Sequence, residues 1–355
     1  MIRAAVRRGA GRLELEQVEL PSPGPEEIVV EVVACGVCAT NLHDWRSPEA
    51  ALPGAALAGV HGHEVSGIVT ATGGRAGGIA VGDHVCLEPA LACSCGSCPP
   101  CRAGRPHSCR NRMTLPVWGF ADAIVVPARG VVPVPPGVDL ELACLAEPLA
   151  ATVHGIRHSS SAAAGGRIDG VKVAVIGAGA IGLCAAVAAR DLGAAEVTVV
   201  ARHERQARIA DALGADRVVR DGPETARAVR ALRPQLVVEA VGGSGEALST
   251  AFRCVDRDGE VVVLGLPDGP QELDVSAAAL RNIRAFFATA YAARDGVTDF
   301  SVALELLARR GDLAALITHR AELHDVNDAF RLADNRAAGV VRLLVRPGAG
   351  RPAGG

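Results

Sequence analysis

The stretch VKVAVIGAGAIGLCAAVAARDLG, residues 171–193, decides the fold of this chain of 355 residues. It begins with a continuous apolar run typical of a buried strand, turns at a cluster of glycines and continues with the composition of a helix. The same alternation follows downstream, with apolar strands predicted at 196–201, 236–241 and 260–265 and helical runs between them. Strands that alternate with helices predict an α/β fold with a parallel, doubly wound sheet.

The glycines of this stretch form a G-x-G-x-x-G pattern, placed directly after the strand and at the start of the helix. Gly177 permits the tight turn, Gly179 lets a pyrophosphate approach the backbone, and Gly182 packs the helix on the sheet. The N–H groups and the positive dipole end of the helix then favour a phosphate. The pattern predicts a dinucleotide-binding loop made of Gly177, Gly179, Ala180, Ile181 and Gly182. A tight turn without a ligand is the alternative.

The end of the next strand indicates which nicotinamide cofactor this loop would take. A strand in this position usually ends in an acidic residue that bonds the adenosine ribose. Here the strand ends at Ala201, and Arg202 follows it. A small residue leaves room for a 2′-phosphate and an arginine can bind one, so NADP(H) is favoured over NAD(H). In the alternative, Arg202 is a solvated residue at a helix start and Glu204 reaches the ribose.

The composition argues against a nucleic-acid-binding, secreted or membrane-spanning protein. A formal net charge of −3, from 36 basic and 39 acidic residues, leaves no excess of positive charge for nucleic acid, so no such partner is expected. The amino terminus lacks the apolar core of a signal peptide. Residues 173–189 carry no charge, but this run of seventeen is slightly short for a membrane span. We therefore expect a cytoplasmic protein without a membrane partner.

Five cysteines lie close together in the sequence CSCGSCPPCRAGRPHSC, which starts at Cys93. Four of them, Cys95, Cys98, Cys101 and Cys109, have the spacing C-x2-C-x2-C-x7-C. In a reducing compartment, clustered cysteines indicate a metal rather than disulfides. Four thiolates complete the tetrahedral shell of zinc, so this structural zinc site is predicted to stabilise a loop and to catalyse nothing. Four unliganded thiols are the alternative.

The remaining motifs together resemble a known family. Residues 1 to about 150 alternate β-rich runs with glycine and proline, which indicates an irregular β domain. This part of the chain contains CGVCATNLHDW (35–45) and GHE (62–64), and AEPLAATVH (146–154) follows. With the cysteine cluster, the glycine loop and the closing GVVRLLV, these fragments resemble the zinc-dependent medium-chain alcohol dehydrogenases. The polyol, sorbitol and threonine dehydrogenase branch is the most similar.

This resemblance implies an α/β protein with a GroES-like, β-rich catalytic domain and a Rossmann domain. The first part of the catalytic domain would be residues 1–154, with both zinc sites. Residues 155–290 would form the NAD(P)-binding Rossmann domain, and residues 291–355 would return to complete the catalytic domain. The resemblance also implies a homodimer or homotetramer.

Four residues are implied to serve a catalytic zinc. Cys38 and His63 correspond to ligands of the family, and Glu64 and Glu147 to the carboxylates of the polyol branch. One thiolate, one imidazole and a carboxylate leave an open or exchangeable position, as a catalytic zinc requires. Which carboxylate binds at rest is left open. His61, which is two residues before His63, is predicted to be structural or at the rim of the pocket.

Three further residues take roles from the resemblance. Thr40 and His43 follow Cys38 at the offsets of a proton-relay hydroxyl and its terminal histidine. Asn41 is a departure, since many relatives carry an aspartate there that supports the zinc histidine. Arg342, in the closing strand, is assigned to cofactor binding.

The expected function is hydride transfer between a small alcohol, or its carbonyl form, and a nicotinamide cofactor at a zinc site. A secondary alcohol, polyol or amino alcohol is the expected substrate class. Asp44, Trp45, Trp118 and Phe120 are candidate pocket residues, with core or surface packing as the alternative. The competing functions are a zinc-free quinone or enoyl reductase of the same superfamily, and a catalytically idle dinucleotide-binding sensor.

Overall fold

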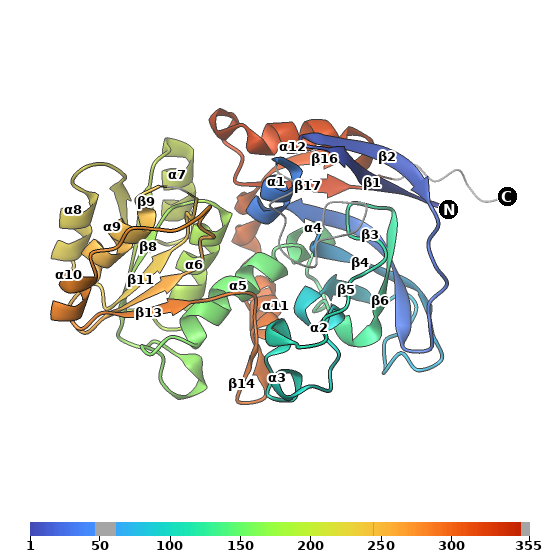
Figure 1. Cartoon of the computed structure of the whole chain (residues 1–355), viewed down its shortest axis with the longest axis horizontal. Helices are drawn as coiled ribbons and strands as arrows, with labels where there is room; N and C mark the ends of the chain where they lie inside the picture. The colour runs from blue at the N-terminus through green and yellow to red at the C-terminus, as the bar shows by residue number, and fades with distance from the viewer. Residues whose placement is uncertain (47–61, 244, 349–355) are drawn as a thin grey trace. The chain divides into compact units, whose positions relative to one another are not determined.

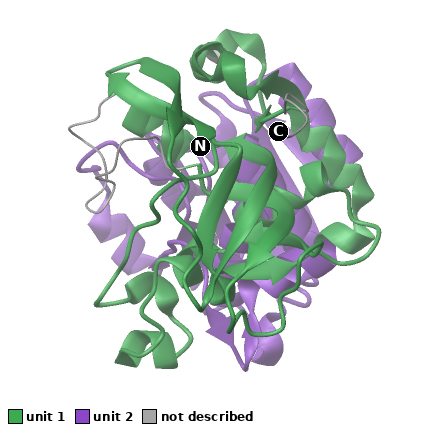
Figure 2. Ribbon diagram, turned by 90° about the vertical axis from the view of Figure 1, so that its right-hand side faces the viewer, with its two compact units in different colours: residues 1–147, 307–355 green, residues 148–306 purple. Residues whose placement is uncertain are grey.

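The computed structural model describes residues 1–46, 62–243 and 245–348, so His61 lies outside the described residues. The chain forms two compact units (Figure 2). Unit 1 contains residues 1–147 and 307–355, and unit 2 contains residues 148–306. The divisions therefore fall inside helix α5 (Ala146–Arg157) and inside helix α11 (Asp299–Arg309).

Unit 1 is built on a seven-stranded sheet with the strand order β16-β17-β3-β4-β5-β7, in which β6 also pairs with β3. The last two strands, β16 and β17, thus complete a sheet that begins with β3, and β17 is antiparallel to β3. The strands are β3 (Glu27–Val37), β4 (Glu64–Thr72), β5 (His84–Leu87), β6 (Ala123–Pro127), β7 (Val131–Pro133), β16 (Ile317–Glu322) and β17 (Arg342–Arg346).

The other described elements of unit 1 surround this sheet. A separate hairpin consists of β1 (Ile2–Gly9) and β2 (Arg12–Val18). The helices are α1 (Ala39–Arg46), α2 (Pro89–Ala92), α3 (Pro99–Arg102), α4 (Leu140–Ala143) and α12 (Val326–Asp334), with short 3₁₀ turns at Pro106–Ser108, Ala128–Gly130, Gly311–Leu316, Leu323–Asp325 and Arg336–Ala338.

Aromatic side chains from distant parts of the sequence close the core of unit 1. The rings of Phe120 and Phe330 meet edge to face with centroids 5.2 Å apart, and Trp45 lies 6.0 Å from Phe330. Trp45 and Phe120 are both buried in this core. Packing against Phe330 is therefore the role that the structure gives to these two of the four candidate pocket residues.

Unit 2 contains the predicted doubly wound sheet. Its six strands are all parallel, in the order β10-β9-β8-β11-β12-β13 (Figure 1). The strand order changes direction between β8 and β11, so the crossovers on either side of that point place helices on both faces of the sheet. The strands are β8 (Lys172–Ile176), β9 (Glu196–Ala201), β10 (Arg217–Arg220), β11 (Leu236–Glu239), β12 (Glu260–Val263) and β13 (Arg284–Phe287).

Helices α6 (Ala180–Asp191), α7 (Glu204–Ala212), α8 (Thr225–Ala231) and α9 (Ala247–Cys254) pack against this sheet, and α10 (Val275–Leu280) precedes β13. The part of α5 in unit 2 also packs here, since Gly155 lies against Val262 of β12. A small hairpin, β14 (Ala293–Arg294) with β15 (Val297–Thr298), precedes α11, and a 3₁₀ turn spans Ala164–Gly166. The uncharged run 173–189 is divided between β8 and α6, and most of its side chains are buried. Within the described residues, we find no helix with the length and apolarity to cross a membrane.

Candidate functional site

The structure brings Cys38 and His63 into contact. Cys38 lies between β3 and α1, and His63 immediately precedes β4, the strand that pairs with β3. The distance between Cys38 Sγ and His63 Nε2 is 3.4 Å. Tetrahedral zinc, with bonds of about 2.3 Å to sulfur and about 2.0 Å to nitrogen, would hold these atoms about 3.5 Å apart. The pair therefore fits two ligands of one zinc ion.

Three groups that can carry negative charge, Cys38, Glu64 and Glu147, are close enough to His63 to change its pKa. Burial lowers the pKa of His63, but the neighbouring Cys38, Glu147 and Glu64 raise it well above its ordinary value overall. Glu147 lies in the first turn of α5, and its charge also raises the pKa of Glu64. The charges of Cys38, Glu64 and Glu147 thus all act on His63, which suits a cation. Among the described residues, however, no three of the four predicted ligands form a group whose ligand atoms all lie within 4.8 Å of one another.

Glu64 is the most enclosed of the predicted carboxylates. It is the first residue of β4, is 1 % exposed, and its Oε1 accepts a hydrogen bond of 2.8 Å from Arg342 Nη1. Burial raises the pKa of Glu64 to about 7, although Arg342 opposes this shift. The register places Gly36 opposite Glu64, and a Cβ on Gly36 would lie 2.0 Å from Glu64 Oε2. Glycine at position 36 therefore makes room for this carboxylate.

Arg342, which the sequence assigned to the cofactor, contacts this carboxylate in the described structure. It begins β17, is 3 % exposed, and also donates to the carbonyl of Val37 at 3.0 Å. Sequence reasoning did not anticipate the pairing of Arg342 with Glu64. An arginine within the apolar strand GVVRLLV is the signal that could have revealed it, because a buried guanidinium requires an acidic partner.

Cys38 and Asn41 form a reciprocal cap at the start of α1. The Cys38 N–H donates to Asn41 Oδ1 at 3.1 Å, and the Asn41 N–H donates to Cys38 Sγ at 3.4 Å. This is the arrangement of a capping box, with a thiol in the place of the usual hydroxyl. Asn41, noted above as a departure from the family pattern, thus orients Cys38 locally. Thr40 and His43, three residues apart on the same helix, share one of its faces.

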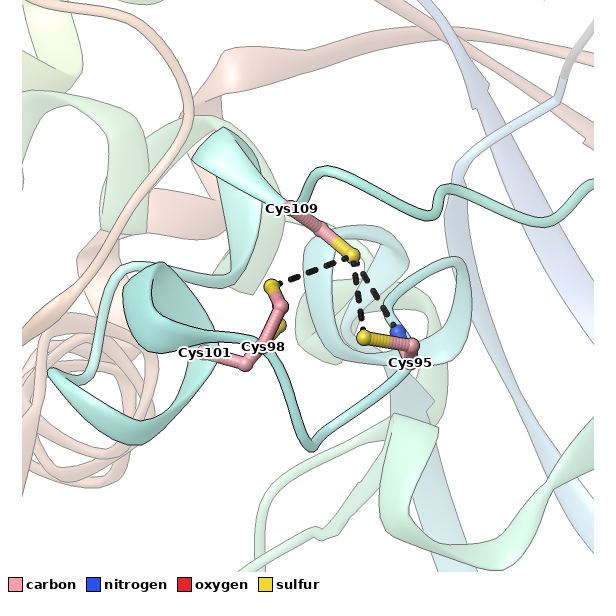
Figure 3. Close-up of side chains that lie close together, drawn as sticks. All are labelled: Cys95, Cys98, Cys101 and Cys109. Carbon is pink, nitrogen blue, oxygen red and sulfur yellow. Dashed lines mark hydrogen bonds between the residues drawn. The ribbon is translucent and has the colours of Figure 1, made fainter.

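The four predicted ligands of the structural zinc also lie together (Figure 3). Their sulfur atoms face a common centre, with separations of 3.4 Å for Cys98–Cys101, 3.5 Å for Cys95–Cys109 and 3.9 Å for Cys98–Cys109. Tetrahedral zinc with bonds of about 2.3 Å would set its thiolates about 3.8 Å apart. Hydrogen bonds from Ser97 lower the pKa of Cys95 to about 5, whereas burial and hydrogen bonds to Cys98 and Cys109 raise the pKa of Cys101 to about 11. A bound metal would favour the thiolate form of all four. The cluster fits a closed zinc site.

The glycine loop has the geometry that its pattern predicts. Gly177 follows β8 with a φ of +103°, and Gly179 is the N-cap of α6. A Cβ on Gly182 would lie 1.9 Å from the Gly177 carbonyl oxygen, whereas a Cβ on Gly179 would meet no atom within 4 Å. Gly182 is thus required by packing, while Gly179 leaves open space at the helix start, with Ala180 and Ile181 in the first turn.

Ala201 and Arg202, the predicted binding residues for the adenosine ribose or its 2′-phosphate, lie at the end of β9, the strand next to β8. β9 pairs with β8 and ends at the buried Ala201, as expected. Arg202 follows, and its Nε and Nη2 atoms lie 3.0 Å and 2.8 Å from Asp221 Oδ2. Asp221 follows β10 and was not considered in the sequence analysis.

A further group of ligand-type residues lies in unit 2, where none was predicted. The fully buried Asp299 pairs with His154 Nδ1 at 2.8 Å, with His158 Nε2 at 3.2 Å and with Arg157 Nη1 at 2.7 Å. The Ala292 N–H also donates to this carboxylate at 2.9 Å. Because Arg157 and this N–H already neutralise and satisfy Asp299, we interpret the group as a structural ion-pair network that joins α5 to α11.

Comparisons with known proteins agree with this geometry. Residues 24–136 match the family model for the alcohol dehydrogenase GroES-like domain, and residues 180–314 match the model for zinc-binding dehydrogenases. The chain is 30 % identical to the L-threonine 3-dehydrogenase of Bacillus subtilis, over 95 % of this chain and 96 % of the relative. It is 31 % identical to the L-threonine 3-dehydrogenase of Pyrococcus abyssi, over 94 % of this chain and 95 % of the relative.

The solved structures include a similar protein with a bound cofactor. A putative zinc-binding dehydrogenase from Sinorhizobium meliloti, solved with NADP, superposes with a TM-score of 0.82 at 29 % identity and covers 98 % of this chain and 99 % of its own. These matches confirm the predicted α/β fold, with its GroES-like and Rossmann domains. The chain belongs to the zinc-dependent medium-chain dehydrogenase family of enzymes.

Proposed function

We propose that this protein is a zinc-dependent dehydrogenase that transfers a hydride between a secondary alcohol or polyol, or the corresponding ketone, and a nicotinamide cofactor, with NADP(H) preferred. The observation that carries the proposal is the contact of Cys38 with His63, together with the charges of Glu64 and Glu147. L-Threonine, the substrate named for the two relatives, also carries a secondary hydroxyl group.

In this proposal, Cys38, His63 and one carboxylate hold the catalytic zinc, which when bound supplies a Lewis acid for the substrate oxygen. Thr40 and His43, on one face of α1, would take the hydroxyl proton toward solvent. Glu64 and Glu147 would alternate at the exchangeable position, with Arg342 holding Glu64 when it is away from the metal. The cysteine cluster at 95–109 would hold a second, structural zinc.

The first test separates the two metals. Cys38→Ala should abolish turnover, remove one zinc per chain in elemental analysis and leave the unfolding temperature nearly unchanged. Cys98→Ala should also remove one zinc but mainly lower the unfolding temperature. Cys35→Ala is the matched control for Cys38, because this buried thiol lies nearby and is not predicted to bind metal. Equal loss of fold in the Cys38 and Cys98 variants would contradict the assignment.

The second test concerns the cofactor and the substrate. The double substitution Ala201→Asp with Arg202→Leu should shift the preference from NADP(H) toward NAD(H), because it exchanges a phosphate-binding charge for a ribose acceptor. Turnover should be measured with both cofactors against L-threonine, polyols and cyclic secondary alcohols. An unchanged cofactor ratio would refute the NADP(H) assignment, and no turnover with any alcohol would refute the proposed reaction.

A further inference from the structure

We propose that Asp221 sets the cofactor selectivity of this enzyme: its carboxylate holds the Arg202 guanidinium and so limits the preference for NADP(H) over NAD(H). This inference rests on the proposed function, in which Arg202 binds the 2′-phosphate. It adds Asp221, which follows β10, to a phosphate site that the sequence pattern places only at the end of β9.

The sheet places these two residues side by side. β9 and β10 are parallel and end together, with Ala201 opposite Arg220. The Asp221 N–H donates to the Ala201 carbonyl at 3.0 Å, so Arg202 and Asp221 each follow the last paired residue of their strand. Both lie at the carboxyl edge of the sheet, the edge at which the glycine loop follows β8. Ligands of doubly wound sheets bind at this edge.

The contact between them uses one edge of the guanidinium. Asp221 Oδ2 accepts from Arg202 Nε at 3.0 Å and lies 2.8 Å from Nη2. The planar guanidinium has five N–H donors, so a second edge that includes Nη1 can bind another oxygen. The Arg202 side chain is 66 % exposed and that of Asp221 is 32 % exposed, so solvent and ligand can reach both.

The charges determine the direction of the effect. A 2′-phosphate gains most from a guanidinium whose charge no other anion shares. Here the guanidinium must divide its charge between Asp221 and the phosphate, or must turn away from Asp221. The 2′-hydroxyl of NAD(H) makes no such demand, because it is neutral. The pair therefore weakens NADP(H) binding more than NAD(H) binding and brings the two cofactors closer in efficiency.

The test compares the ratio of kcat/KM for NADP(H) to kcat/KM for NAD(H) in matched variants. Asp221→Asn keeps the shape and a hydrogen-bond acceptor but removes the charge, and it should raise this ratio about tenfold, mainly through KM. Arg202→Gln should lower the ratio by a similar factor. In the double variant, the gain from Asp221→Asn should disappear, because the carboxylate acts through Arg202.

Asp256→Asn is the control. Asp256 pairs with Arg233 in the same way, with Oδ2 3.0 Å from Nε, but these residues precede β12 and β11 at the opposite edge of the sheet. This variant should leave the ratio unchanged. If Asp221→Asn unfolds at a lower temperature than the parent protein, Asp221→Ser can be used instead, because it also removes the negative charge.

The outcomes separate the two proposals. A parent enzyme that neither binds nor turns over a nicotinamide cofactor, by fluorescence titration and by assay, would overturn the proposed function and this inference with it. An active parent enzyme whose ratio stays within twofold in both Asp221 variants would overturn the inference alone. A gain that persists without Arg202 would also overturn it, because the carboxylate would then act on the phosphate directly.

Discussion

At the scale of single residues, the candidate site depends on small side chains that leave space for charged ones. Gly36 lies across from Glu64, where a methyl group would collide with the carboxylate that Arg342 holds. Asn41 fixes Cys38 through two hydrogen bonds, in each of which the backbone N–H of one residue donates to the side chain of the other. The predicted ligands are thus positioned by residues that are not predicted to bind the metal, as is common for metal ligands in proteins.

Gly36→Ala adds a single methyl group, but we expect it to reduce both activity and stability. The added Cβ must displace Glu64 or Arg342, both of which are buried, so we expect at least a tenfold loss of kcat/KM and a loss of about 1–3 kcal/mol in the free energy of unfolding. Turnover and urea denaturation measure these two effects. Gly74→Ala is the control, because a Cβ there meets no atom within 4 Å. Equal effects of the two substitutions would contradict this explanation.

At the scale of elements, two glycines in the turn between β8 and α6 have different roles: Gly182 is required for packing, and Gly179 is predicted to be required for cofactor binding. Gly182→Ala should lower the unfolding temperature of the protein without cofactor, because its Cβ would lie 1.9 Å from the Gly177 carbonyl oxygen. Gly179→Ala should leave that temperature unchanged but weaken cofactor binding at least tenfold, since Gly179 is where the pyrophosphate would approach. Thermal unfolding and fluorescence titration with NADPH measure the two effects. Similar melting losses in both variants would refute the distinction.

The network around Asp299 should stabilise helices α5 and α11. Burial raises the pKa of Asp299, but hydrogen bonds from His154 and His158 and the Ala292 N–H outweigh it, so the pKa lies well below its ordinary value. Asp299→Asn would leave Arg157 buried without its charge partner. We expect it to lower the free energy of unfolding at pH 7 by about 3 kcal/mol.

The pH dependence follows from the sign of this shift. A carboxylate whose pKa is lowered by folding stabilises the protein above its unfolded pKa of about 4, and this contribution is lost as the pH falls toward the folded pKa. The difference between the parent protein and Asp299→Asn should therefore be constant above about pH 5 and shrink below about pH 4. Urea denaturation across this range measures it. If the difference in the free energy of unfolding between the two proteins grew as the pH fell, the pKa shift of Asp299 would have the opposite sign, and the stabilising role of the network would be refuted.

At the scale of the whole molecule, the two units have separate cores and separate predicted ligands. The core of unit 1 contains Phe120 and Phe330, and the core of unit 2 is formed by valines of its parallel sheet such as Val237 and Val261. Units with separate cores can unfold in separate steps. Zinc would stabilise unit 1, and the dinucleotide would stabilise unit 2.

Calorimetry should detect this division. NADPH at 100 times its dissociation constant should stabilise unit 2 by about 2.7 kcal/mol and shift one unfolding transition upward. A zinc chelator should shift the other transition downward, because unit 1 contains both predicted zinc sites. Cys98→Ala should reproduce part of the chelator effect without altering the NADPH-dependent transition. A single transition that both ligands move together would show that the units unfold as one.

The features of this protein that depend on local pattern could be predicted from the amino-acid sequence. The glycine turn, the alternation of strands and helices and the four-cysteine loop are encoded within short segments, where spacing alone dictates geometry. The predicted catalytic ligands come from the resemblance to a family, because Cys38 and His63 are far from Glu147 in the chain and no local rule joins them.

The partners of the charged side chains, in contrast, could be identified only from the folded chain. Arg342 meets Glu64 because β17 pairs with β3, Arg202 meets Asp221 because β9 and β10 end together, and Asp299 meets His154 across 145 residues. A charged side chain in a sequence shows that a partner is needed, because an unpaired charge is costly to bury. Which partner it finds is set by strand order and register, and these follow from the packing of the whole fold.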